Sequence, residues 1–290
     1  MKQHKISLLN IIISAILLVY SISVLLPLLW GLLASIKSVD EFRLNILGIP
    51  QDWAFGNFPF VIKYFAVPAN VRGFMRTVGL AEMIYNTILY VTGSALLSAA
   101  VPCLTAYLCS KFPCFLSRFV YGTVIITMIL PIVGAYPSEL QVLRNLGLYD
   151  TFYGMWVQRA NFLGMYFLIF FAAFKGIPKE FSEAAYVDGA SEMSLMLRIQ
   201  FVLVRNTFFT VFLIRFIEFW NDYQAPLLYM PGHPTLSYGL YYLSYSTING
   251  LNNIPMRMAG TILVIVPILS LFIAFKERIM GNMTMGGIKG

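Results

Sequence analysis

Polar side chains with the types and spacing to do chemistry are concentrated in two regions of this apolar chain. The first region separates two very hydrophobic stretches and contains Glu183, Ala184, Ala185, Asp188, Gly189 and Ala190. Its two alanines allow another surface to approach closely, and its acidic side chains can cap helix ends or pair with basic groups. Its glycine permits the backbone to turn where other residues would be strained. The pattern predicts two short helices joined by a turn, which is typical of a docking element.

The second region lies at the end of a later hydrophobic stretch. Arg215 and Glu218 are three residues apart, so they share one face of a helix. Because a charge in lipid costs roughly 3 kcal/mol even on lenient scales, the two side chains either neutralise each other or face a polar pathway. Asn221, Asp222 and Tyr223 follow. Amide and carboxylate groups can bind sugar hydroxyls and aromatic rings can stack on sugars, although tyrosine is also common at any membrane interface.

The sequence carries none of the motifs of a catalytic or nucleotide-binding subunit. It lacks Gly-x-x-x-x-Gly-Lys-Ser/Thr, His-Glu-x-x-His, Cys-x-x-Cys and Gly-x-Ser-x-Gly. His4 and His233 are isolated, and Cys103, Cys109 and Cys114 have no metal-binding spacing, so buried reduced thiols are expected. We therefore expect no catalytic residue, no metal and no cofactor in this chain. The net charge of +7 forms no basic stripe with interleaved aromatics, which argues against nucleic acid as a partner.

The composition is that of a membrane protein that crosses the bilayer several times. Hydrophobic residues make up 59% of the 290 residues, charged residues make up 11%, and the mean hydropathy is +0.75. Apolar spans are expected at residues 6–36, 82–110, 119–136, 160–174, 205–221 and 258–275. All six should be helices, because open strands cannot satisfy their backbone groups in lipid. The prediction is one all-α integral membrane domain over residues 1–290, with the docking element in a loop at 175–204.

Three motifs resemble those of a known family. Glu-Ala-Ala, three residues, glycine, nine residues and isoleucine, which ends here at Ile199, is similar to the signature loop of ABC importer permeases. The run 177–190 resembles the carbohydrate-uptake branch of that family, and the run 220–229 resembles its Trp-Asn-Asp-aromatic and Pro-Leu element. The tail 281–290 is similar to the tail of permeases in the polysaccharide and aldouronate group.

The chain departs from the family pattern directly after the signature loop. The family usually continues isoleucine-x-leucine-proline, whereas Ile199 is followed here by Gln200, Phe201 and Val202. Loss of the proline removes a fixed kink before the next apolar segment. The sequence therefore leaves the shape of the loop exit open, while the docking role is still expected.

The resemblance implies a type I ABC importer permease fold with six transmembrane helices and both termini in the cytosol. It implies a bacterial cytoplasmic membrane location beside a second permease subunit, an ABC ATPase dimer that binds ATP and Mg²⁺, and an extracytoplasmic solute-binding protein. Oligosaccharides or polysaccharide fragments are the implied substrate, carried by alternating access. Basic residues that flank the spans also favour a cytosolic N-terminus, which places the loop 175–204 on the side of the ATPase.

The resemblance also implies a role for each group of residues. Coupling to the ATPase is implied for Glu183, Ala184, Ala185, Asp188, Gly189 and Ala190. Contact between the C-terminal tail and the ATPase dimer is implied for Gly286, Gly287 and Lys289. A position along the substrate pathway is expected for Arg215, Glu218, Asn221, Asp222 and Tyr223.

The sequence leaves two other functions open. One is an ABC importer permease for a non-sugar solute, such as a polyamine or a phosphonate. The other is an ATP-independent secondary carrier or a membrane scaffold, although carriers tend to show inverted repeats that this sequence does not display. The aromatic-rich segment 37–80 also has two interpretations, either a docking surface for the delivery protein or local packing at the membrane interface.

Overall fold

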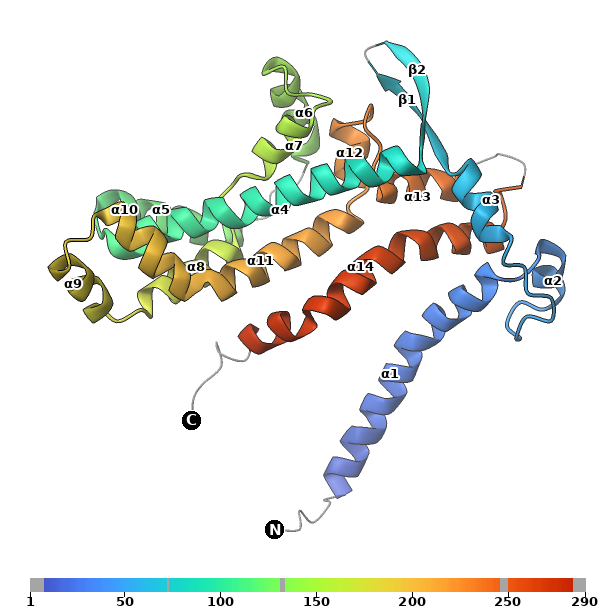
Figure 1. Ribbon diagram of the computed structural model, residues 1–290, viewed down its shortest axis with the longest axis horizontal. Helices are drawn as coiled ribbons and strands as arrows, with labels where there is room; N and C mark the ends of the chain where they lie inside the picture. The colour runs from blue at the N-terminus through green and yellow to red at the C-terminus, as the bar shows by residue number, and fades with distance from the viewer. Residues whose placement is uncertain (1–7, 72, 131–133, 246–249, 284–290) are drawn as a thin grey trace. The chain divides into compact units, whose positions relative to one another are not determined.

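The computed structural model describes residues 8–71, 73–130, 134–245 and 250–283. Its elements follow in chain order (Figure 1) as α1 (Leu8–Ser35), α2 (Val39–Leu44), α3 (Asn57–Tyr64), β1 (Ala66–Val71), β2 (Phe74–Gly79), α4 (Leu80–Lys111), α5 (Phe115–Ile129), α6 (Tyr136–Asn145), α7 (Phe152–Arg159), α8 (Met165–Lys175), α9 (Glu180–Val187), α10 (Glu192–Ser194), the π-helical turn η1 (Leu195–Gln200), α11 (Phe201–Asn221), α12 (Gln224–Tyr229), α13 (Leu236–Ser244) and α14 (Ile254–Met283). The chain folds into two compact units, residues 1–65 with 240–267 and residues 66–239 with 268–290.

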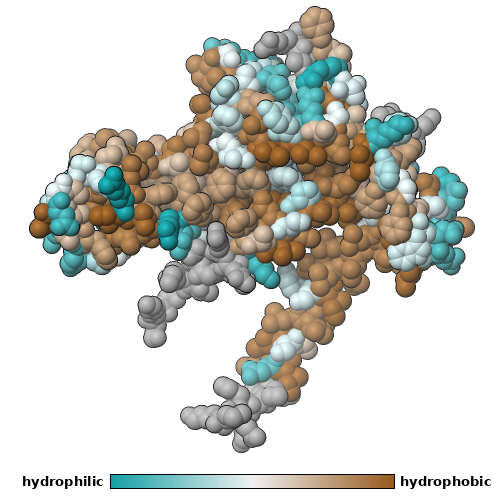
Figure 2. All heavy atoms as spheres, viewed as in Figure 1, coloured by the Kyte–Doolittle hydropathy of each residue, from teal (hydrophilic) through white to brown (hydrophobic). Residues whose placement is uncertain are grey.

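Most of the described chain is helical, and four of its helical stretches are long and apolar enough to cross a membrane. These stretches are Leu9–Ser35, Leu80–Lys111, Glu192–Asn221 and Ile254–Lys276. Helices α5 and α8 are also apolar but shorter. Helix α1 exposes its large apolar side chains along its length, which gives the hydrophobic surface seen in Figure 2. Such a surface is stable only against lipid or other membrane helices.

The first unit holds the residues that follow α1 close to its end. The side-chain amide of Asn57 donates to the carbonyl oxygens of Ser35 and Lys37, each at 2.8 Å. The indole N–H of Trp30 donates to the Ile46 carbonyl at 3.0 Å. These bonds tie α1 to α3 and to the segment between them. Aromatic side chains of the same segment, Trp53 and Phe55, are exposed, so both interpretations of the segment stay open.

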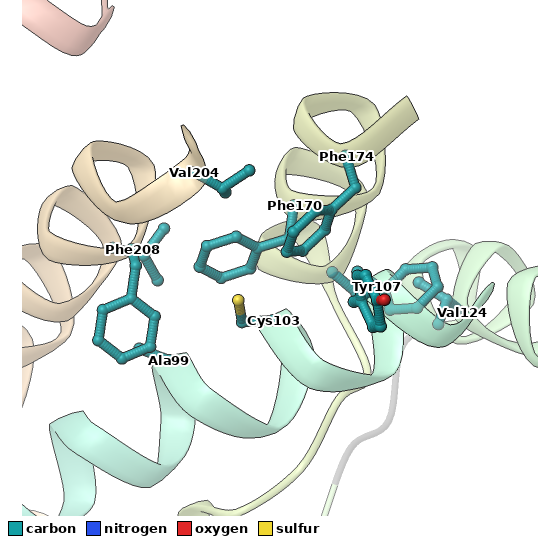
Figure 3. Packing of buried hydrophobic residues seen from close by; sticks show 11 residues of the cluster. Ala99, Cys103, Tyr107, Val124, Phe170, Phe174, Val204 and Phe208 are labelled. Atoms are coloured by element: carbon teal, nitrogen blue, oxygen red, sulfur yellow. The ribbon is translucent and has the colours of Figure 1, made fainter. Parts of the chain in front are cut away.

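The core of the second unit is built where α8 and α11 pack on α4. The contact face of α4 contains small buried residues, among them Ala99 and Ala106, which let the neighbouring helices approach. The Cys103 thiol faces Phe170 of α8 and Phe208 of α11 (Figure 3). This apolar packing fixes α11, which carries Arg215, Glu218 and Asn221 of the predicted pathway.

Helix α7 and a short hairpin complete the second unit. Gly93 allows α7 to lie against α4, because a Cβ at that position would be 2.3 Å from the Trp156 ring. The Trp156 indole then donates to the Leu89 carbonyl at 3.1 Å. Strands β1 and β2 pair antiparallel from Ala66 opposite Gly79 onward, an element that the all-helical expectation did not include.

Helices α5, α8 and α14 differ in extent from the predicted spans, and α14 (Ile254–Met283) extends beyond both ends of the expected 258–275. Helix α5 begins earlier than residue 119 because the Cys114 thiol accepts the Ser117 backbone N–H at 3.4 Å and caps the helix. It ends at Ile129, where Leu130 takes the extended conformation common before a proline. Helix α8 begins five residues after the expected position 160, because Gly164 has φ 124° and interrupts the helix.

The three cysteines differ in their exposure. All are free thiols, with Cys103 buried, Cys109 half-buried and Cys114 exposed. The expectation of buried thiols is therefore wrong for Cys114, since its capping position before the first turn of α5 lies at the surface.

Candidate functional site

The predicted docking element folds as the short helix α9 followed by a tight turn. The backbone N–H groups of Gly189 and Ala190 donate to the carbonyls of Tyr186 and Ala185, at 3.0 and 2.9 Å. This pair of bonds is a Schellman ending, which requires a left-handed residue after the helix. Gly189 supplies it with φ 76°. The sequence therefore ends α9 at a fixed place and turns the chain toward α10.

Helix α9 is attached to the helix that follows it. Gln200, which is fully buried in η1, donates from its side-chain amide to the Ser182 hydroxyl at 2.9 Å. The Tyr186 hydroxyl donates to a Glu192 carboxylate oxygen at 2.7 Å, and this bond raises the pKa of Tyr186. Buried Ala185 completes the inner side of α9. These contacts attach α9 to α10 and to η1, which leads directly into α11.

The π-helical turn η1 answers the question that the missing proline left open. The backbone is helical in π form from Leu195 to Gln200 and continues directly into α11, whose first turn has Val202 in place of the family proline. Gln200, which occupies the variable position of the family pattern, makes the bond to α9. Sequence reasoning did not identify Gln200 or Ser182, because neither lies at a position that the family pattern fixes.

The outer side of α9 presents the remaining predicted coupling residues. Glu183, Ala184 and Asp188 are exposed, as is Gly189. Val187 is 88% exposed although it is apolar. An exposed surface of small and apolar residues with two carboxylates is suited to contact with another protein.

The predicted pathway residues Arg215 and Glu218 form one ion pair on α11. An Arg215 guanidinium nitrogen lies 2.6 Å from a Glu218 carboxylate oxygen. Arg215 also donates to the Ser98 hydroxyl of α4 at 3.2 Å, and the Tyr166 hydroxyl of α8 donates to Glu218 at 3.0 Å. The pair therefore joins three helices, while the Glu218 side chain is still 45% exposed.

Asp222 forms a second polar cluster at the end of α11. One of its oxygens accepts from the Arg159 guanidinium and from the Tyr90 hydroxyl, both at 3.0 Å. The other oxygen accepts the backbone N–H of Ala225 at 3.0 Å. The Phe219 ring lies between the two clusters, 5.1 Å from the Arg159 guanidinium and 4.7 Å from that of Arg215.

A third polar contact extends these clusters toward α6 and α12. A Glu139 carboxylate oxygen accepts from the Tyr229 hydroxyl at 2.7 Å and from the Gln158 amide at 2.8 Å. We call the residues joined in this way the polar seam, and its members are Tyr90, Ser98, Glu139, Gln158, Arg159, Tyr166, Arg215, Glu218, Asp222 and Tyr229. Sequence reasoning missed all of them except three, because their partners are far apart in the chain.

The other predicted site residues lie outside the polar seam. The Asn221 side chain is exposed and donates to the Ile217 carbonyl of its own helix at 2.9 Å. Tyr223 is 40% exposed beside it. Gly286, Gly287 and Lys289 lie outside the described residues. The structure thus brings Arg215, Glu218 and Asp222 together. It leaves Asn221 and Tyr223 at the adjoining surface.

The chain was compared with protein families, curated proteins and solved structures. Residues 100–279 match the family described as binding-protein-dependent transport system inner membrane component. A diacetylchitobiose uptake permease of Streptomyces coelicolor is 24% identical over 94% of this chain and 86% of its own. A probable permease for starch degradation products from Thermoanaerobacterium thermosulfurigenes is 24% identical over 92% of this chain and 95% of its own. A bacterial ABC transporter that imports the acidic polysaccharide alginate has the same fold, with TM-score 0.74, 22% identity and coverage of 96% and 98% of the two chains. This chain belongs to the family of inner membrane components of binding-protein-dependent transport systems.

Proposed function

We propose that this chain is one permease subunit of an ATP-driven ABC importer that takes up oligosaccharides or polysaccharide fragments. The observation that carries the proposal is helix α9, whose exposed outer face is suited to contact with an ATPase. Its inner side is hydrogen-bonded to Gln200 of η1, the turn that leads into α11. Family membership supports the transport role. Relatives named for diacetylchitobiose, starch products and alginate support the substrate class.

The proposal includes six membrane spans with both termini in the cytosol. Helices α5 and α8 serve as the third and fourth spans beside the four long helices. The 11 residues of α8 reach only about 17 Å, which is short of a hydrocarbon core of about 30 Å. The non-helical residues 160–164 must therefore complete this crossing, which is tolerated where protein and not lipid surrounds the backbone.

Coupling is proposed to run from the ATPase through α9 into α11. When ATP closes the partner ATPase dimer, the surface formed by Glu183, Ala184 and Asp188 moves with it. The bonds from Gln200 and Tyr186 transmit this movement to η1 and to α11. Because packed helices change between discrete arrangements, the movement switches the pathway between outward-open and inward-open states.

The polar seam is proposed to stabilise the wall of the pathway beside the solute. Glu218 retains exposed surface, and Asn221 and Tyr223 adjoin it, so these three residues are the proposed contacts for sugar hydroxyls and rings. Arg215 and Asp222 are proposed to hold the wall in place, since their polar atoms are occupied by neighbouring helices.

Partner subunits complete the proposed ABC importer. A second permease completes the pathway, and an extracytoplasmic solute-binding protein delivers the sugar. The ATPase dimer binds ATP and Mg²⁺ and carries out hydrolysis, so this chain is not itself an enzyme. Gly286, Gly287 and Lys289 of the tail are proposed to reach into that dimer.

The proposal is tested by reconstituting the full complex in liposomes. The solute-binding protein, loaded with a labelled oligosaccharide, is added outside, and ATP with Mg²⁺ is enclosed. We expect uptake that requires ATP and is competed by unlabelled saccharide. Uptake without ATP would instead identify a secondary carrier. Competition by spermidine or a phosphonate, with no effect of saccharides, would identify an importer for another solute.

A further inference from the structure

A cavity of about 410 Å³ lies among the neighbouring ends of α4, α5 and α8. Its lining includes Arg118 and Lys175, and none of its lining residues is acidic. Within the described part of the chain neither cation forms an ion pair. The cavity lining therefore carries two positive charges and no negative charge, which favours an anionic ligand.

The remaining lining of the cavity suits a phosphate group. Tyr121 contributes a hydroxyl group to the lining, whereas the Ser110 and Ser117 hydroxyls already donate to the carbonyls of Tyr107 and Cys114. It adjoins the start of α5, whose N-terminal dipole favours negative charge, and the ends of α4 and α8, whose opposite dipoles are balanced by Lys111 and Lys175. Phe171 provides an apolar wall that holds the Lys175 ammonium 5.7 Å from its ring centre. Two cations, the Tyr121 hydroxyl and an apolar wall together form a site for a phosphate ester.

The surroundings of the cavity favour a lipid over a soluble phosphate. The first turns of α5 expose large apolar side chains, namely Phe115, Leu116 and Phe119, with Phe115 85% exposed. Helices α4 and α8 end here at Lys111 and Lys175, and α5 begins close to Arg118. A lipid whose phosphate occupies the cavity can lay its acyl chains along this apolar face. Basic pockets between membrane helices bind anionic headgroups in this way.

We propose that this cavity is a binding site for the phosphate headgroup of an anionic phospholipid. The inference rests on the proposed membrane placement of α5 and α8, and it is independent of the transported solute. The site adjoins the coupling element, because a second cavity of about 440 Å³ shares Lys175 and Ser110 with it and reaches Ser182 and Glu183 of α9. A bound headgroup therefore stabilises the junction between α8 and α9.

Native mass spectrometry of the detergent-solubilised complex tests the site. The full-length chain, purified with its partner subunits, is titrated with phosphatidylglycerol or with phosphatidylcholine of the same acyl chains. We expect preferential retention of phosphatidylglycerol. The double variant Arg118→Gln and Lys175→Gln should weaken this retention about 30-fold, as expected for two cations near a phosphate.

Two further double variants separate charge at the cavity from charge in general. Arg118→Lys with Lys175→Arg keeps both charges and should retain the lipid. Arg43→Gln with Arg144→Gln removes two exposed charges elsewhere, on α2 and α6, and should also retain it. Retention of phosphatidylglycerol by the Arg118 and Lys175 double variant, or equal retention of the two lipids by the wild type, would overturn the proposal.

Two further measurements test for other occupants of the cavity. One is competition with a soluble phosphate ester, and the other is retention of the ATPase subunits. If glycerol phosphate at millimolar concentration displaces the lipid, the cavity is a soluble phosphate site and the lipid proposal is wrong. If the double variant loses the ATPase subunits but keeps the lipid, the cations serve the ATPase and the proposal is also wrong. Because the titration uses neither ATP nor sugar, its outcome does not depend on whether the complex transports oligosaccharides.

Discussion

At the scale of single residues, Asp222 illustrates how position along a pathway differs from contact with a solute. Both of its carboxylate oxygens accept hydrogen bonds from the protein itself, from Arg159 and Tyr90 on one side and from the Ala225 backbone on the other. These bonds fix the turn from α11 into α12. Asp222 is thus a positioning residue, and its removal should affect stability before it affects solute affinity.

Replacing Asp222 by asparagine is predicted to lower the free energy of unfolding by about 3 kcal/mol. The Arg159 guanidinium, whose side chain is only 26% exposed, would lose its counter-charge, which is costly for a charge largely removed from water. Thermal unfolding of the solubilised protein measures the effect. As a control, Glu82→Gln breaks the exposed pair with Arg76 and should cost less than about 1 kcal/mol. Equal costs for the two variants would contradict the prediction.

Gly189 offers a second prediction, with a glycine of matched geometry as its control. Gly189 and Gly147 have φ of 76° and 67°, and a Cβ at either would meet nothing within 4 Å. Valine at either place suffers the same left-handed strain of roughly 1–2 kcal/mol. Gly189→Val should uncouple ATP hydrolysis from uptake, because it distorts the end of α9, while Gly147→Val should transport normally. Reconstituted uptake and ATPase rates give the comparison, and equal loss in both variants would remove α9 from the coupling path.

At the scale of elements, the attachment of α9 to η1 determines how well a displacement is transmitted. Ser182→Ala removes the acceptor for the buried Gln200 amide, and an unsatisfied buried donor costs roughly 1–3 kcal/mol. Amide hydrogen exchange in α9 is therefore predicted to rise about tenfold. Adding Gln200→Leu removes the unsatisfied donor and should restore part of the protection.

The exchange measurement has its own control in a distant serine. Ser138 is exposed on α6, so Ser138→Ala should leave exchange in α9 unchanged. If Ser182→Ala also leaves α9 exchange unchanged, the bond to Gln200 does not hold the element in place, and transmission must depend on Tyr186 and Glu192 alone.

The elements also show what a single sequence can and cannot predict. Hydrophobic length located α1, α4 and α11 closely, because lipid demands about 20 apolar residues per crossing. Local turn chemistry at Gly189 ended α9 where the motif indicated. The polar contacts, however, join distant residues, such as Arg159 and Asp222, which lie 63 positions apart. Such contacts come from tertiary packing, which no local pattern encodes.

At the scale of the whole molecule, the orientation in the membrane decides whether α9 can meet an ATPase. Six spans with a cytosolic N-terminus place both the α4–α5 connection and the α8–α11 connection on the cytosolic side. The geometry of the second unit is consistent with placing both connections on one side, because one cavity is lined both by Lys111 at the end of α4 and by Ser182 of α9. These two connections therefore lie at the same end of the unit. An experiment that assigns one of them to a side of the membrane also assigns the other.

Cys114 provides a native probe for that orientation. It is exposed at the start of α5, and the Ser117 backbone N–H that bonds its sulfur lowers the pKa of the thiol, so more reactive thiolate is present at neutral pH than for an ordinary cysteine. In a Cys109→Ser background, a membrane-impermeant maleimide should label inverted vesicles and not intact spheroplasts, and further Cys114→Ser should abolish labelling because Cys103 is buried. Labelling only from the outside would place α9 away from the cytosol, and coupling to a cytosolic ATPase through this helix would then be ruled out.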